Sequence, residues 1–200
     1  MRMIAAALVS LALMICASAQ AQTPQTRVRG VVESLDGRTL VVKTADGATA
    51  TVTLAPDYSV GAVVKATAAE IRKGGFIGVG ARPQADGSLL AVQVFIFPEA
   101  MRGTGEGHRP WGVLPDSTMT NATVAETVSR VDGASVMLTY PGGEQKVTIT
   151  AEANVIMAAP AQAADLVAGA QVAMTATRQL GGGLTASRVT IAKAGAQLPL

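Results

Sequence analysis

The amino-acid sequence predicts an all-β protein with short helices, organised as two tandem five-stranded β-barrels. Two observations lead to this prediction. Short segments rich in Val, Thr and Ala alternate with Asp-Gly and Gly-Gly turns, which is typical of β-hairpins. The two halves of the chain also repeat the same order of turns, helix end and last strand, about 95 residues apart. Only 3% of the residues are aromatic, so we expect thin cores of Val, Ala, Leu and Ile.

The first half predicts five strands and one helix. The Asp-Gly pairs that start at Asp36 and Asp46 separate three strands of a meander, and Gly74-Gly75 ends a short segment without β alternation. The expected strands are residues 28–35, 39–44, 49–54, 76–81 and 89–97, with a helix over residues 66–73. A helix between the third and fourth of five strands is the order of an OB-type barrel.

The second half repeats these signals. Asp36-Gly37 corresponds to Asp132-Gly133, and the helix end at residues 70–74 corresponds to residues 165–169. We therefore predict an internal duplication, with one OB-like barrel in residues 27–97 and a second in residues 124–193. Residues 98–123 form the linker between them.

At these residues each half resembles a family found in exported bacterial proteins, domain of unknown function number 5666. The resemblance rests on Gly30-Val31-Val32, the Asp-Gly hairpins, the helix ends at residues 70–74 and 165–169, and the closing segments from Gly87 and Gly182. The second half departs from the pattern at its start. The resemblance implies an OB-like fold in two tandem copies and brings no catalytic residues with it.

The N-terminus predicts an export signal over residues 1–21. Arg2 precedes an apolar run from Ile4 to Ile15, and small residues around Ala19 and Ala21 suit cleavage. A lipid anchor on Cys16 is not expected, because Ile15 stands where a small residue is needed. We expect a periplasmic or secreted protein with no transmembrane segment and no disulfide in the mature chain.

The charge balance argues against nucleic-acid binding. The chain has 16 Lys and Arg against 14 Asp and Glu, a formal charge of +2. Nucleic-acid-binding barrels combine a basic groove with stacking aromatic rings, and this chain has three Phe, two Tyr and one Trp. The expected partner is therefore an unidentified envelope protein or a small ligand.

We expect a protein that is not an enzyme and has no cofactor, with two alternatives left open. An envelope hydrolase would place its site in the linker. One form is a triad of the single histidine, His108, and Asp116 with Ser117 or Thr118, and the other is a carboxylate pair of Glu99 and Glu106. A copper-handling protein would bind Cu(I) through His108 and the thioethers of Met101 and Met119. We expect these three side chains not to converge on one point, because their spacing is irregular.

The linker holds the candidate binding surface. Arg102, Glu106, His108, Arg109 and Trp111 all lie in it, and Trp111 is the only tryptophan. We expect the ring to be mostly buried between the two barrels, so that truncation to alanine costs about 3–5 kcal/mol. The alternative is that the ring is displayed for binding. The Asn-Ala-Thr match to a glycosylation signal that follows, residues 121–123, is interpreted as coincidence.

Overall fold

The computed structural model describes residues 24–130 and 133–198. This part of the chain forms strands joined by short connections and three single 3-10 turns. The strands are β1 (Gln25–Asp36), β2 (Thr39–Thr44), β3 (Thr49–Lys65), β4 (Phe76–Pro83), β5 (Leu89–Ile96), β6 (Gly107–Pro110), β7 (Thr118–Arg130), β8 (Gly133–Tyr140), β9 (Gly143–Thr150), β10 (Asn154–Ala159), β11 (Gln171–Arg178) and β12 (Leu184–Ala192). The 3-10 turns are η1 (Ala68–Glu70), η2 (Glu99–Met101) and η3 (Ala163–Asp165). The all-β prediction is confirmed.

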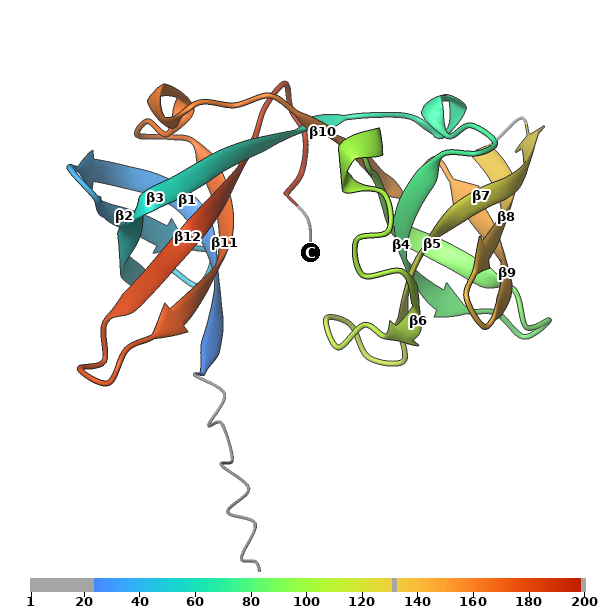
Figure 1. Cartoon of the computed structure of the whole chain (residues 1–200), viewed down its shortest axis with the longest axis horizontal. Helices are drawn as coiled ribbons and strands as arrows, with labels where there is room; N and C mark the ends of the chain where they lie inside the picture. The colour runs from blue at the N-terminus through green and yellow to red at the C-terminus, as the bar shows by residue number, and fades with distance from the viewer. Residues whose placement is uncertain (1–23, 131–132, 199–200) are drawn as a thin grey trace, which may run out of the picture.

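Ten of the strands close two rings of five hydrogen-bonded strands each (Figure 1). The first barrel runs β1–β2–β3–β12–β11 and back to β1, and its only parallel pair is β3 with β12. The second barrel runs β7–β8–β9–β5–β4 and back to β7, and its only parallel pair is β5 with β9. Both rings therefore have the same pattern of pairing.

Each barrel contains strands from both halves of the chain. The prediction that residues 27–97 and residues 124–193 each close their own barrel is wrong. The hairpin β4–β5 leaves the first three strands and joins the second barrel, and β11–β12 joins the first barrel in return. The exchange is possible because the two hairpins offer similar apolar side chains to the interior: Ile77 and Val79 in one, Val172 and Met174 in the other.

The two barrels are joined where the exchanged connections cross. The end of β3 pairs antiparallel with β10, and β10 pairs parallel with β5, so hydrogen bonds run continuously from one barrel to the other. Figure 1 shows this bridge between the barrels. A small apolar cluster of Val63, Ile156 and Ala196 is buried there. β3 itself continues past Leu54, where the sequence predicted its end, and reaches Lys65.

Both cores are built as the composition predicts. The buried clusters inside the two rings consist of Val, Leu, Ile, Ala and one Met, without an aromatic ring. Residues of each strand alternate between this interior and the outside. The rings of Phe76, Phe95, Phe97 and Trp111 are therefore left for surfaces outside the cores.

The helix expected over residues 66–73 is a single 3-10 turn, η1. The backbone N–H of Thr67 donates a hydrogen bond of 2.6 Å to the carboxylate of Glu70, which satisfies the first free donor of the turn. Asp165 forms the same contact with the N–H of Gln162 in η3 at 2.8 Å. These short turns are the corners at which the chain passes between barrels.

Three other predictions concern the ends and the linker. The predicted export signal, residues 1–21, lies outside the described residues. Residues 118–123, assigned to the linker, belong instead to β7, and residues 107–110 form β6. Within the part of the chain that the structure describes, no helix is long and apolar enough to cross a membrane.

Candidate functional site

The linker segment, defined here as residues 98–117, covers the outward face of β4. Residues of β4 alternate between the core, where Ile77 and Val79 lie, and the outward face, where Phe76, Gly78 and Gly80 lie. All five are nevertheless buried. The outward face is therefore covered rather than exposed to water.

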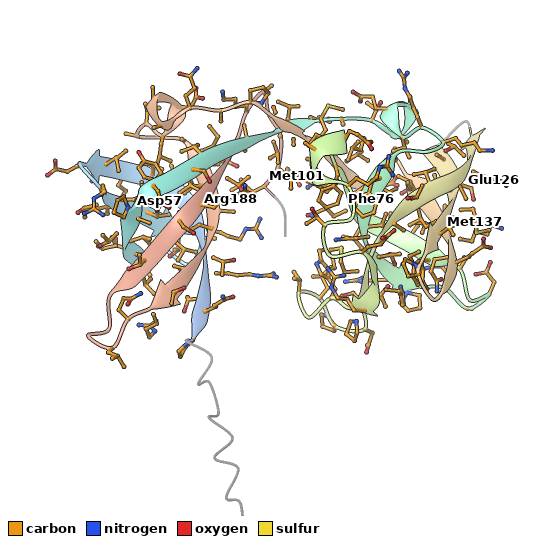
Figure 2. All side chains as sticks on the ribbon, in the orientation of Figure 1. Asp57, Phe76, Met101, Glu126, Met137 and Arg188 are labelled. Carbon is orange, nitrogen blue, oxygen red and sulfur yellow. The ribbon has the colours of Figure 1, made fainter. Side chains whose placement is uncertain are left out.

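Arg102 fixes one end of this cover. Its guanidinium donates a 2.8 Å hydrogen bond to the carbonyl of Gly74 and lies 6.0 Å from the centre of the Phe76 ring. It also pairs with Glu99 at 2.5 Å. This hydrogen bond lowers the pKa of the Glu99 carboxyl below its usual range and raises the pKa of Arg102. Figure 2 shows Phe76 and Met101 on the side of the second barrel that faces the first.

Two glycines open a trench in the outward face. Gly78 and Gly80 have no side chains, whereas their neighbours on β5 and β7 have large ones. The outward face is therefore hollowed along β4 between two rows of side chains. Two rows of paired residues cross the sheet here: Phe95–Gly78–Asn121–Gly107 and Gln93–Gly80–Met119–Arg109. Glycine in the interior of a strand is typical of a close approach by another group.

Trp111 fills part of this trench. A Cβ atom on Gly80 would lie 2.5 Å from Cη2 of the indole, so the ring rests directly on the glycine backbone. The backbone N–H of Trp111 donates to the carbonyl of Ser117 at 3.0 Å, which fixes the approach of the chain. The side chain is half-buried. Trp111 thus packs on the outward face of β4 in the second barrel, where it is half-buried, whereas the sequence predicted a mostly buried ring between the two barrels.

Trp111→Ala is expected to lower the free energy of unfolding by about 2 kcal/mol. This cost is below the 3–5 kcal/mol of a fully buried ring, because part of the indole already contacts water. Urea unfolding of wild type and variant measures the difference. A change below about 0.5 kcal/mol would mean that the ring does not stabilise the cover.

Asn121 lies beside Gly78 and is only 6% exposed. Its Nδ2 donates a 2.9 Å hydrogen bond to the carbonyl of Thr104 in the linker segment. Its Oδ1 accepts no hydrogen bond from the described residues. A Cβ on Gly78 would lie 2.7 Å from this oxygen, so only glycine leaves room for it. A buried amide oxygen without a donor is uncommon in folded proteins.

These side chains line a cleft of about 260 Å³. Its walls come from β4, β5, β6 and β7, from Phe97 just before the linker segment and from Trp111 within it, and one residue, Arg27, reaches it from β1 of the first barrel. The lining residues are Arg27, Gly78, Gln93, Phe95, Phe97, Arg109, Pro110, Trp111, Met119 and Asn121. Among the described residues no carboxylate lines the cleft. It combines aromatic rings, two amides and two guanidinium groups, which suits a polar ligand with an apolar face.

Of the five candidate residues, the structure brings Arg109 and Trp111 into the cleft. His108 lies elsewhere: its Nδ1 is 2.8 Å from Oγ1 of Thr120, and its ring stacks loosely on Tyr140, with the centroids 6.0 Å apart. Arg102 and Glu106 do not line the cleft. Arg102 stabilises the cover instead.

The geometry does not support the copper alternative. Across the β6–β7 pair His108 stands opposite Thr120, and Arg109 stands opposite Met119. Neighbouring residues of a strand point to opposite faces, so Met119 lies on the cleft side and His108 on the other. In residues 24–130 and 133–198, no group of three or more His, Cys, Asp or Glu side chains could hold a metal ion.

The hydrolase alternative has no geometric support either. Glu99 is paired with Arg102. Glu106 is exposed, and neither it nor His108 lines the cleft. None of these three side chains lines the cleft, the concave surface that acid–base catalysis beside the linker segment would use.

Sequence reasoning missed most of the cleft. The pattern around Asn121 indicates only a chance glycosylation match, and Gly78 and Gly80 belong to the strand expected over residues 76–81. The signal that could have found the cleft is the spacing of those two glycines. A period of two inside a strand puts both on one face, and a strand face without side chains invites cover by another group.

Comparisons with protein-family models, with curated proteins and with solved structures found no match for this chain.

Proposed function

We propose that this chain is an exported, non-enzymatic binding protein of the bacterial cell envelope, with two OB-like barrels arising from an internal duplication. The leader pattern in residues 1–21 supports export to the periplasm or beyond. The ring order, with one parallel pair closing each barrel and a turn between the third and fourth strands, supports the OB-like assignment. The resemblance to an exported bacterial family points the same way and stays a prediction.

The observation that carries the binding proposal is the unpaired Oδ1 of Asn121 in the cleft. Leaving a buried acceptor without a donor costs about 1–3 kcal/mol. A ligand N–H or O–H would remove that cost on binding. The half-buried indole of Trp111 offers a flat apolar surface next to it. The ligand class is therefore a small polar molecule, or one end of a larger molecule, with a hydrogen-bond donor and an apolar ring face.

Asn121→Leu tests this role before the ligand is identified. Leucine has nearly the shape of asparagine and lacks the unpaired oxygen, while the Thr104 carbonyl that loses its donor lies at an exposed residue and can bind water. We expect the free energy of unfolding to stay the same or rise by about 1 kcal/mol. Chemical denaturation measures it. Asn121→Ala is the control, because it removes the oxygen but leaves a hole above Gly78 and should destabilise.

The binding assay uses the only tryptophan as its probe. Trp111 lines the cleft, so its fluorescence should change when a ligand enters. We expect at least one compound from a panel of neutral and acidic monosaccharides and amino acids to change the emission of wild type, and to bind Asn121→Leu at least about tenfold more weakly. A loss of about 1 kcal/mol or more in the stability of Asn121→Leu, with binding unchanged, would identify the amide as structural and remove the proposal's main support.

A further inference from the structure

Arg27 lines both the cleft on the second barrel and a second hollow on the first barrel. The second hollow has a volume of about 530 Å³. We name its surface the arginine face, and its residues are Gln25, Arg27, Arg29, Ala173, Met174, Thr175, Thr177, Ser187, Arg188 and Thr190. Figure 2 shows Arg188 on the side of the first barrel that faces the second. A ligand larger than a monosaccharide could therefore extend from one barrel to the other.

The arginine face is the counterpart of the covered face of β4. Arg27 stands opposite Thr175 on β11, and Arg29 stands opposite Ala173. Arg188 comes from β12, on the other side of β11. In the second barrel β4 takes the position that β11 has in the first barrel. The residues of β7 that lie beside the outward face of β4 are Met119 and Asn121. One barrel thus presents rings and amides and the other presents guanidinium groups over short side chains.

The charges on this surface are not balanced by the protein. Arg27, Arg29, Arg109 and Arg188 line the two hollows, and among the described residues no Asp or Glu lines either of them. Arg29 donates a 3.3 Å hydrogen bond to the carbonyl of Leu198. Burial, and then repulsion from Arg27, lowers the pKa of Arg29. Guanidinium groups that repel one another without an acidic partner favour an anion placed between them.

The remaining lining groups indicate what carries the anionic charge. Four side chains of the arginine face carry hydroxyl groups: Thr175, Thr177, Ser187 and Thr190. They suit a ligand that has many hydroxyls of its own. In the cleft, the indole of Trp111 offers a stacking surface and Asn121 an acceptor for a ligand O–H. A chain of sugar rings that bear carboxylate groups has all of these features: hydroxyl groups, apolar ring faces and negative charge.

Single-stranded nucleic acid fits this surface less well. Successive bases need several stacking rings along a basic path. Here Phe95 and Phe97 pack against each other edge to face, with centroids 4.7 Å apart, which leaves Trp111 as the flat platform of the cleft. The whole chain also has a formal charge of only +2.

We propose that the cleft and the arginine face form one binding groove for an acidic oligosaccharide, with a sugar ring against Trp111 and Asn121 and its carboxylates on Arg27, Arg29 and Arg188. This inference rests on the proposed function and names its ligand class. Arg27 is the central residue because it lines both parts of the groove.

The test measures binding of oligogalacturonate to the full mature chain by titration calorimetry and Trp111 fluorescence, at low and at moderate salt. We expect Arg27→Gln and Arg188→Gln each to weaken binding about tenfold or more, since each removes charge-assisted hydrogen bonds. Added salt should weaken wild-type binding further. Arg82→Gln is the matched control: Arg82 is exposed and lines neither hollow, so its loss should change affinity less than about twofold.

Neutral dextran oligomers and oligothymidylate complete the test. Equal binding of dextran, unaffected by Arg27→Gln but lost in Asn121→Leu, would overturn the acidic groove and leave the proposed binding function intact. Tighter binding of oligothymidylate than of oligogalacturonate would overturn it in favour of nucleic acid. Absence of oligogalacturonate binding would also overturn the acidic groove. The proposed binding function would then be tested separately, by the stability of Asn121→Leu and its binding of the monosaccharide and amino-acid panel.

Discussion

A chain cut inside the linker segment is expected to remain one particle. A protease site inserted between Pro115 and Asp116, which are both exposed, would separate β1–β6 from β7–β12. Neither product holds a complete barrel, because β4–β5 and β11–β12 are exchanged. The cut products should therefore elute together at the mass of the intact chain and separate only in denaturant.

The reason is the size of what would have to be broken. Separating the products would open the parallel pair of β3 and β12, the pair of β1 and β11, and both contacts of the β4–β5 hairpin with the second barrel. It would also expose both apolar cores, whose burial is the main favourable term in folding. A denaturing gel is the control that cutting is complete. Two separate folded products in native chromatography would contradict the exchange and restore independent barrels.

Local turn chemistry made the strands predictable. Gly37 and Gly47 have φ of 56° and 83°, a backbone region that glycine adopts without strain, and the strand predicted over residues 39–44 is observed between them. The choice of barrel for each hairpin could not be predicted in this way. The two hairpins bury similar residues, so the decision lies in the path of residues 66–75, which carry β4 away from β3.

The site was predictable only in part for a related reason. Trp111 attracts notice because it is the single tryptophan, and the structure places it in the cleft beside Arg109, while its role in binding stays a prediction. Asn121 becomes notable only when the register puts it beside Gly78. The role of Arg27 could not be predicted from the sequence, because this residue of β1 lines the cleft from the other barrel.

Gly30→Ala is expected to have the largest effect of any single substitution discussed. Gly30 lies where β1 pairs on both sides at once, with Thr44 of β2 and Val172 of β11. A Cβ at this position would lie 2.0 Å from the backbone carbonyl oxygen of Lys43. No rotation of a side chain can relieve a clash with backbone, so β2 would have to move away from β1.

That movement would disturb the core, because Val42 is completely buried directly beside the contact. We expect a loss of about 3 kcal/mol or more, the upper end of what overpacking costs. For a chain of this size that is a drop in Tm of roughly 6–12 °C, measured by thermal unfolding followed by circular dichroism. Gly61→Ala in β3 is the control, because a Cβ there meets no atom within 4 Å and should leave Tm nearly unchanged. Equal Tm values for the two variants would mean that β1 does not approach β2 as closely as the structure has it. The close packing of β1 against β2 at Gly30 would then not be a source of stability for the first barrel.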